Sequence, residues 1–167
     1  MTGSSTDRLA LPLLEPGQAQ KEMFHNEALV RLDAAVQACA VAGGLDAPPA
    51  DPAAGQCWIV GASPSGAWSG HAGALACWTL SGWRFVAAAE GMRAWIADPA
   101  GFALHSGGEW RFGEAHGRLI VEGVQVVGPQ AAAIGNPSGG SVVDAEARST
   151  IAQILAAMRE HGLVDPG

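Results

Sequence analysis

Six tryptophans and no tyrosine make the indole the side chain of this sequence best suited to binding chemistry. An exposed indole offers a flat apolar face that stacks on sugar rings and an N–H that donates at its edge. Trp68 and His71 lie together in the loop-like run SPSGAWSGHAG, and loops carry binding residues more often than strands do. We therefore select Trp68, His71 and Trp78 as the candidate glycan-binding residues. The other four tryptophans are expected to pack in a core: Trp58, Trp83, Trp95 and Trp110.

Catalytic motifs are absent from the sequence. It contains no nucleophile elbow, phosphate-binding loop, dinucleotide-binding glycine motif or His-Glu-x-x-His zinc motif. The five histidines are far apart and lack metal-ligand spacing. Four acids, Glu90, Asp98, Glu109 and Glu114, are candidates for a glycosidase pair, but only their separation in space would identify one. We expect no enzyme activity, no metal and no cofactor.

The charge balance excludes one class of partner. Nine basic against 16 acidic residues give a formal net charge of -7, and Lys21 is the only lysine. Binding to a phosphate backbone needs clustered Lys and Arg, so we expect no nucleic-acid partner. The first residues show neither a signal peptide nor a membrane span, which predicts synthesis in the cytoplasm, no membrane insertion, and release by lysis if the protein reaches the outside. Cys39, Cys57 and Cys77 are expected to be reduced, buried thiols.

The elements that must position these residues begin with a flexible arm over residues 1–15 and a helix over residues 16–40. Pro16 fits the first helical position, where no N–H is needed. Phe24, Ala28 and Leu32 recur at helical spacing, followed by Ala35 and Cys39, and predict the face that packs. The polar residues that crowd the first turns are candidates for contact with other subunits: Gln18, Gln20, Lys21, His25 and Asn26.

A Gly/Pro linker over residues 41–56 leads to a β-rich domain over residues 57–128. The runs CWIV at 57–60 and AWIA at 94–97 are each followed by a segment that ends in Trp-Arg-Phe, at 83–85 and at 110–112. This internal repeat predicts two similar β-hairpins in a small antiparallel sheet or open barrel, with turns at Ser81-Gly82 and Gly107-Gly108. Strand alternation places the arginine of each triplet on the solvent face.

A second linker over residues 129–143 precedes an amphipathic helix over residues 144–163. Asp144 is a good N-cap, and Gly162 is a helix stop with Leu163 folding back on Met158. Ala147, Ile151, Ile154 and Met158 form an a/d seam, and isoleucine at both kinds of position favours trimers or tetramers over dimers. The alternative, weighed equally from the pattern, is that the seam docks on the chain's own core. The fold class is α+β, with a helix at each end of a tryptophan-rich sheet.

The segment LPLLEPGQAQKEMFHNEALVRLD resembles the opening of an uncharacterised domain family of alphaproteobacterial prophages and gene transfer agents. The resemblance continues to about Phe112, and the C-terminal tail is similar to the ends of phage fibre proteins. It implies a particle component, commonly a trimer, with no catalytic residues to carry over. It also implies partners among other particle proteins and at the recipient cell surface.

Three functions follow in order of preference. The first is a structural and adhesive subunit, a fibre, a spike or an adaptor for one, of a tailed phage or gene transfer agent particle. This subunit would contribute to attachment, with a cell-surface polysaccharide as a possible ligand. The second is a stand-alone carbohydrate-binding module. The third, and weakest, is a glycan-degrading enzyme.

Overall fold

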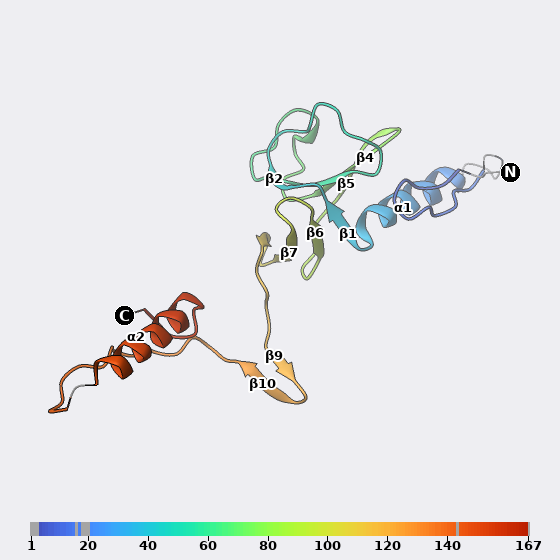
Figure 1. Ribbon diagram of the computed structural model, residues 1–167. Coiled ribbons are helices and arrows are strands. Elements are labelled where there is room, and N and C mark those ends of the chain that lie inside the picture. The colour runs from blue at the N-terminus through green and yellow to red at the C-terminus, as the bar shows by residue number, and fades with distance from the viewer. Residues whose placement is uncertain (1–3, 16, 18–20, 143, 167) are drawn as a thin grey trace. The chain divides into compact units, whose positions relative to one another are not determined.

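The computed structural model describes residues 4–15, 17, 21–142 and 144–166, and it has an α+β fold with open sheets and no closed barrel among these residues (Figure 1). The chain divides into two compact units, Met1–Ala115 and His116–Gly167. The first contains α1 (Lys21–Ala35), β1 (Ala38–Ala40), β2 (Gly43–Leu45), β3 (Cys57–Val60), the 3₁₀ helix η1 (Gly66–Trp68), β4 (Leu75–Thr79), β5 (Gly82–Val86), β6 (Arg93–Ile96), β7 (Gly101–Ser106) and β8 (Glu109–Phe112). The second contains β9 (Leu119–Val121), β10 (Val124–Val127) and α2 (Ala145–Glu160).

The N-terminal arm is folded where it is described. Ser5 and Pro12 form an antiparallel bridge, and the Thr6 N–H donates to the Leu11 carbonyl at 3.0 Å. The expectation of a flexible arm over residues 1–15 is therefore wrong for the described residues 4–15. The predicted helix start at Pro16 lies outside the described residues.

Helix α1 ends at Ala35, five residues earlier than predicted. Gln37 has a φ of 45°, which turns the chain out of the helix, and β1 follows at once. The apolar stripe predicted to pack faces solvent instead, because Phe24 is 78% and Leu32 is 50% exposed. The buried residues of α1 are Asp33 and Ala34. Hydrogen bonds from the N-terminal arm to Asp33 and from Arg84 to Glu27 help to hold the helix in place. A pattern of hydrophobic residues does not reveal such polar contacts.

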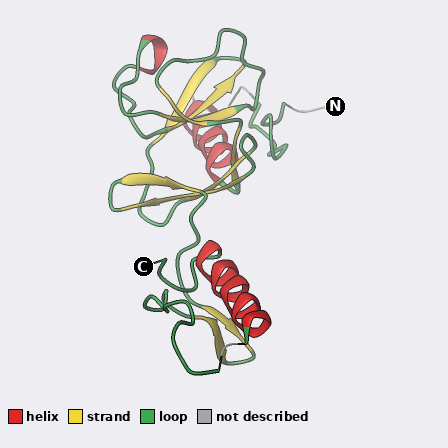
Figure 2. Cartoon of the chain, turned by 60° about the vertical axis from the view of Figure 1, so that its left-hand side comes forward, coloured by secondary structure: helices red, strands yellow, loops and turns green. Residues whose placement is uncertain are grey.

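Two four-stranded sheets are built from the predicted repeat (Figure 2). One has the strand order β2-β3-β4-β5 and the other β1-β6-β7-β8. In each, three antiparallel strands form a meander, and a three-residue strand is added in parallel to its first strand. The segment from Ala38 to Leu45 supplies both added strands, so the predicted helix end and linker are partly strand. Each of these strands has three residues, and β2 begins with two glycines, so neither shows the alternating apolar pattern by which a strand is predicted.

The hairpin turns match the prediction closely. Gly107 and Gly108 join β7 to β8 with φ values of 65° and 85°, as a two-residue turn with positive φ at both positions requires. The β4–β5 turn is Leu80-Ser81, one residue before the predicted pair, since Thr79 is opposite Gly82. Of the two triplet arginines, Arg111 is exposed as expected and Arg84 differs from the expectation. Arg84 is only 28% exposed, because α1 covers it and Glu27 accepts from its Nε at 2.8 Å.

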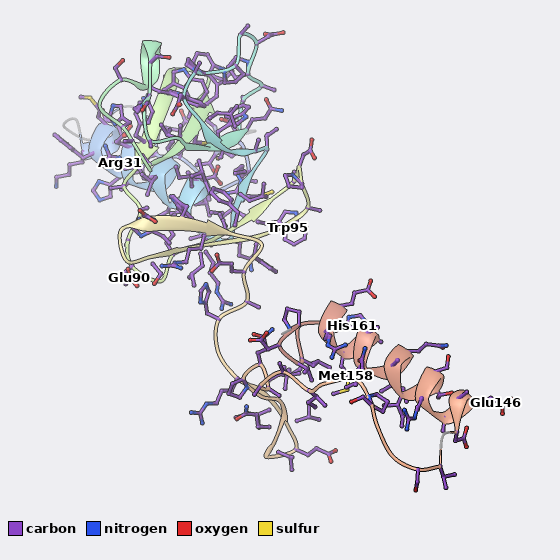
Figure 3. All side chains as sticks on the ribbon, turned by 90° about the vertical axis from the view of Figure 1, so that its left-hand side faces the viewer. Arg31, Glu90, Trp95, Glu146, Met158 and His161 are labelled. Atoms are coloured by element: carbon purple, nitrogen blue, oxygen red, sulfur yellow. The ribbon has the colours of Figure 1, made fainter. Side chains whose placement is uncertain are left out.

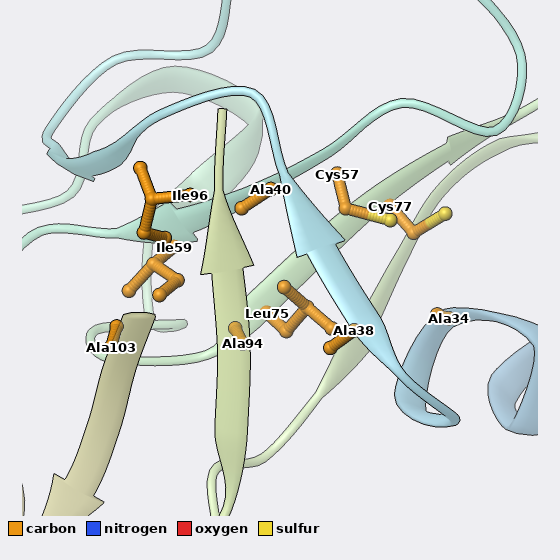
Figure 4. Packing of buried hydrophobic residues seen from close by; sticks show 10 residues of the cluster. All are labelled: Ala34, Ala38, Ala40, Cys57, Ile59, Leu75, Cys77, Ala94, Ile96 and Ala103. Atoms are coloured by element: carbon orange, nitrogen blue, oxygen red, sulfur yellow. The ribbon is translucent and has the colours of Figure 1, made fainter. Parts of the chain in front are cut away.

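The core of the first unit has two parts on opposite faces of the β2-β3-β4-β5 sheet. The face toward the second sheet and α1 is packed with small and aliphatic residues (Figure 4): Ala34, Ala38, Ala40, Cys57, Ile59, Leu75, Cys77, Ala94, Ile96 and Ala103. The opposite face carries a tryptophan cluster around Trp58 and Trp68. Cys57 and Cys77 are buried as expected, whereas Cys39 is exposed, because alternation in β1 turns it away from the core.

The second unit contains an antiparallel β9–β10 hairpin and helix α2. The hairpin therefore lies outside the unit that holds the other strands, although it was predicted to belong to one domain over 57–128. Helix α2 agrees with its prediction. The Asp144 carboxylate accepts from the Ala147 N–H at 2.9 Å, and the Leu163 N–H donates to the Met158 carbonyl at 2.9 Å beyond a Gly162 with φ of 69°.

Candidate functional site

Trp68, the first candidate for glycan stacking, is a core residue. Its side chain is 0% exposed, and its ring centroid lies 5.3 Å from that of Trp83 and 6.4 Å from that of Trp58. The loop that carries it is anchored, because the Ser65 N–H donates to the Asp46 carbonyl at 2.7 Å. The expectation that an indole in this loop would be accessible is wrong. Trp68 closes one face of the sheet.

His71 and Trp78 are half-buried, and each already has an aromatic partner. The His71 ring is stacked on Phe85, with centroids 3.6 Å apart and planes 3° apart. Trp78 lies opposite Trp83 in the sheet, with ring centroids 5.0 Å apart. The fold thus brings Trp68 and Trp78 to one cluster, but as mutual packing around Trp83, with much of their ring surface covered.

The open aromatic surface lies on the other sheet. Trp95 of β6 is opposite Phe102 of β7, and the rings meet edge to face with centroids 5.0 Å apart. The two side chains are 40% and 59% exposed, and Figure 3 shows Trp95 projecting from its strand. The expectation that Trp95 packs in the core is therefore wrong. The alternation of Arg93 and Trp95 with Ala94 and Ile96 was the signal that they share the solvent face.

Positive charge borders this aromatic pair. Arg93 is opposite Leu104, which in turn is opposite Arg111, so these three side chains form the next row on the same face. Both arginines are exposed. Arg111 also lies 3.8 Å from the Glu114 carboxylate, a separation typical of a weak surface ion pair. We name the face formed by Arg93, Trp95, Phe102, Leu104 and Arg111 the aromatic face. Two aromatic rings beside two guanidinium groups suit a ligand with flat apolar surfaces and negative charge.

Two cavities flank the Phe112 ring at the edge of the same sheet. One of about 440 Å³ is lined by Ile59, Trp110 and Phe112 among others, and one of about 240 Å³ lies beside Pro99 and Phe102. The Phe112 ring rests directly on Gly43, where a side chain would collide with it. Trp110 is fixed by its Nε1, which donates to the Gly73 carbonyl at 2.8 Å.

Asn26 and Asp33 of α1 hold the N-terminal arm. The Asn26 amide accepts from the Leu14 N–H at 2.9 Å and donates to the Leu14 carbonyl at 3.0 Å. The buried Asp33 carboxylate accepts from the Thr6 hydroxyl at 2.8 Å and from the backbone N–H groups of Arg8 and Leu9. Asn26, selected as a subunit contact, therefore has a structural partner within the chain.

The remaining candidates for subunit contact are only partly placed. Lys21 and His25 are exposed at the described start of α1, where His25 Nδ1 lies 2.8 Å from the Lys21 carbonyl oxygen. Gln18 and Gln20 lie outside the described residues. Exposed Met23 and Phe24 add an apolar surface to this helix start.

Two carboxylates have shifted acidities. Burial would raise the pKa of Glu27, but hydrogen bonds from Arg84 and Arg31 outweigh it, and the pKa is lowered from its ordinary value of 4.5. Hydrogen bonds from the Ser106 hydroxyl and the Gly107 N–H lower the pKa of Glu90. Both carboxylates are ionised at neutral pH and bind other parts of the chain. A glycosidase needs one acid with a raised pKa, which neither of them supplies.

The second unit exposes apolar side chains on both of its elements. In the β9–β10 hairpin, large apolar residues that point to opposite faces are about half exposed or more: Leu119, Ile120, Val121, Val124 and Val127. On α2, Ala147, Ile151 and Ile154 of the predicted seam are exposed, and Met158 is half-buried. The helix buries Leu155 instead.

Two further properties concern the described part of the chain. No group of three or more His, Cys, Asp or Glu side chains in it is placed to hold a metal ion. Neither described helix combines the length and the apolar character that crossing a lipid bilayer requires.

Residues 25–111 match a family described as Protein of unknown function (DUF2793), a range that runs from the first turns of α1 almost to the end of β8. No curated protein matches the chain.

Proposed function

This chain belongs to the family described as Protein of unknown function (DUF2793), and we propose that it is a structural and adhesive subunit of a phage-like particle. In this proposal it is a fibre or spike subunit, or an adaptor for one, of a tailed phage or gene transfer agent. The second unit joins copies of the chain to one another, and the first contributes to attachment at the cell surface. The chain is made in the bacterial cytoplasm and released with the particle by lysis. The resemblance of residues 11–33 to prophage and gene transfer agent sequences supports this setting.

The observation that carries the proposal is the exposed apolar surface of the β9–β10 hairpin. An isolated two-stranded hairpin is at best marginally stable in water. Here neighbouring residues such as Ile120 and Val121 point to opposite faces, and both are more than half exposed. Contiguous apolar surface of this kind marks a site of protein association. Assembly with further copies would cover both faces.

Helix α2 supports the same conclusion. It packs within its own unit through Leu155, which leaves Ile151 and Ile154 available to a partner. Leu155 lies four positions after Ile151 and borders the seam, so the helix is buried along one edge of the seam while Ile151 and Ile154 stay exposed. Isoleucine at both a and d positions favours more than two strands, so we propose a trimer.

The experiment that tests assembly is solution mass by light scattering. We expect the full chain to be a trimer and a chain that ends before Asp144 to be a monomer. Ile151→Asp with Ile154→Asp should give monomers, because each buries a charge in the seam. Gln153→Asp is the matched control, since Gln153 is exposed on another face. A monomeric full chain would contradict the proposal.

A stand-alone carbohydrate-binding module is the second candidate, and the exposed Trp95–Phe102 pair favours it. Its flanking arginines suit an acidic polysaccharide. We expect Trp95→Ala with Phe102→Ala to abolish retention on an immobilised uronic-acid polysaccharide, while Leu80→Ala, which removes another exposed apolar side chain, leaves it intact. Retention that is unchanged in the double variant would exclude the aromatic face as the binding site. This result is independent of the oligomeric state.

A further inference from the structure

Cys57 and Cys77 face each other directly across β3 and β4. The N–H of Trp78 donates to the Gln56 carbonyl at 2.9 Å, so the pair on one side of the cysteines is a hydrogen-bonded pair. Such pairs alternate with non-hydrogen-bonded pairs along an antiparallel ladder. Cys57 and Cys77 therefore occupy a non-hydrogen-bonded position.

A hydrogen bond at the other end of β3 confirms this assignment of hydrogen-bonded and non-hydrogen-bonded pairs. There the N–H of Val60 donates to the Ala74 carbonyl at 2.9 Å, three positions further along each strand. An odd number of steps from a hydrogen-bonded pair leads to a non-hydrogen-bonded one. The two ends of the strand pair thus assign the same register to the two cysteines.

This position has the geometry that a disulfide requires. Opposed residues at a non-hydrogen-bonded position have Cα atoms about 4.5 Å apart, within the range of about 4.4–6.8 Å found in disulfides. Both side chains lie on the same face of the sheet, and Figure 4 shows them next to each other in the core. The Cys57 thiol donates to the Gly55 carbonyl at 3.7 Å, and the Cys77 thiol donates to the Trp78 carbonyl at 3.9 Å. The backbone need not move far to join the sulfurs.

We propose that Cys57 and Cys77 are a modification site, at which a small-molecule disulfide such as oxidised glutathione converts the two thiols into a cross-strand disulfide. The proposal does not depend on the proposed function. The bond would close the loop that carries Trp68 and would fix β3 to β4 in the middle of the core. The chain would then have a reduced form in a reducing compartment and a stapled form outside it.

The reaction balances as two exchange steps. The Cys77 thiolate attacks one sulfur of glutathione disulfide, forming a mixed disulfide and releasing one glutathione thiolate. The Cys57 thiolate then attacks the Cys77 sulfur and releases the second glutathione. The two protein thiols lose two electrons and two protons, and the glutathione disulfide gains them as two thiols.

The environment of the pair assigns the order of these steps. Interaction with the neighbouring Cys57 lowers the pKa of Cys77, so Cys77 supplies the first thiolate. Interaction with Cys77 and burial raise the pKa of Cys57, which keeps it protonated until the mixed disulfide has formed. Cys39 is exposed on β1 of the other sheet and is not part of the pair.

The experiment uses the full chain with Cys39→Ser, which removes the exposed thiol and its intermolecular reactions. The protein is equilibrated in glutathione buffers of increasing oxidised fraction, starting once from the reduced protein and once from protein oxidised in denaturant and refolded. Intact mass, free-thiol counting and peptide mapping are read at each ratio. Because equilibrium is reached from the reduced and from the oxidised protein, the result does not depend on how slowly the buried thiols react.

We expect both starting forms to converge on a species that lacks both thiols and is about 2 Da lighter, the mass of two hydrogen atoms, with a peptide that links Cys57 to Cys77. Dithiothreitol should reverse the change, and the Tm of the linked form should be higher by on the order of 10 °C. A Cys77→Ala variant should stay reduced, because the remaining Cys57 thiol has a raised pKa and lacks the thiol that makes the first attack. Two free thiols from both directions, or a stable glutathione adduct on the unsubstituted pair, would overturn the proposal.

Discussion

Asn26 and Asp33 lie seven positions apart on helix α1, and each side chain holds a different part of the N-terminal arm by two or more hydrogen bonds. Residues seven apart lie on the same face of a helix. The Arg8 guanidinium adds bonds in the other direction, to the carbonyls of Asp33, Ala34 and Gln37 near the helix C-terminus. The arm is therefore part of the fold, and it caps the last turn of α1.

Asp33→Ala should destabilise the first unit by about 3 kcal/mol or more, because it leaves a hydroxyl and two backbone N–H groups of the arm without their acceptor. Urea unfolding measures the loss, and hydrogen exchange should show faster exchange at Leu9. Asp7→Asn is the control, since Asp7 is an exposed neighbour in the same arm. Equal stability of the two variants would contradict the structural role of Asp33.

Trp68→Ala should lower the free energy of unfolding much more than Trp95→Ala does. Loss of the fully buried Trp68 ring should cost about 3–5 kcal/mol, because it empties the centre of the tryptophan cluster. Loss of the exposed Trp95 ring should cost about 1 kcal/mol, the scale of one aromatic cross-strand pair. Thermal or urea unfolding of the two variants measures the difference, and a larger loss for Trp95→Ala would reverse our assignment of core and surface.

Glu27→Gln should lower stability in a pH-dependent way. The folded-state pKa of Glu27 lies below its ordinary value of 4.5, so the stabilisation is complete above that pH and is lost as the pH falls through the folded pKa. Because the pair with Arg84 is partly exposed, we expect a difference of at most about 1 kcal/mol at pH 7. Unfolding at pH 7 and pH 3 tests this. Wild type and variant should converge at the lower pH, whereas an exposed Glu109→Gln control should show no difference at either.

Gly43→Ala should destabilise the first unit by about 1–3 kcal/mol, because the new methyl group meets the Phe112 ring. Phe112→Leu in the same chain should recover part of the loss, and a double-mutant cycle measures this coupling. Gly101→Ala is the matched control, since nothing lies within 4 Å of a side chain built there. Additive effects of the two substitutions would show that the ring and Gly43 do not limit each other.

The sequence predicted the elements whose signals are local. The hairpins follow from alternation and from Gly107-Gly108, and α2 follows from Asp144 and Gly162 at its ends. The buried face of α1 could not be predicted in this way. Its contacts join Asp33 to an arm about 25 positions away and Glu27 to Arg84, 57 positions away, and no periodic pattern reports such pairs.

The candidate binding surface was missed for a related reason. Trp68 follows a loop that Asp46 anchors, and its ring is buried against Trp58 and Trp83, which are distant in sequence. Trp95 lies in an apolar run, and its exposure follows from which face of the second sheet is covered. Local sequence indicates that a strand alternates, but it does not say which of two faces meets the rest of the chain.

The segment from Ala38 to Leu45 gives one strand to each sheet, so the folding of one repeat depends on the folding of the other. The second meander, from β6 to β8, takes its fourth strand from chain that precedes the first meander. The second repeat can therefore not be excised as a self-sufficient fragment, since a cut between Val86 and Arg93 separates β6 from β1. The two repeats therefore belong to one cooperative folding unit, which should unfold in one thermal transition rather than two.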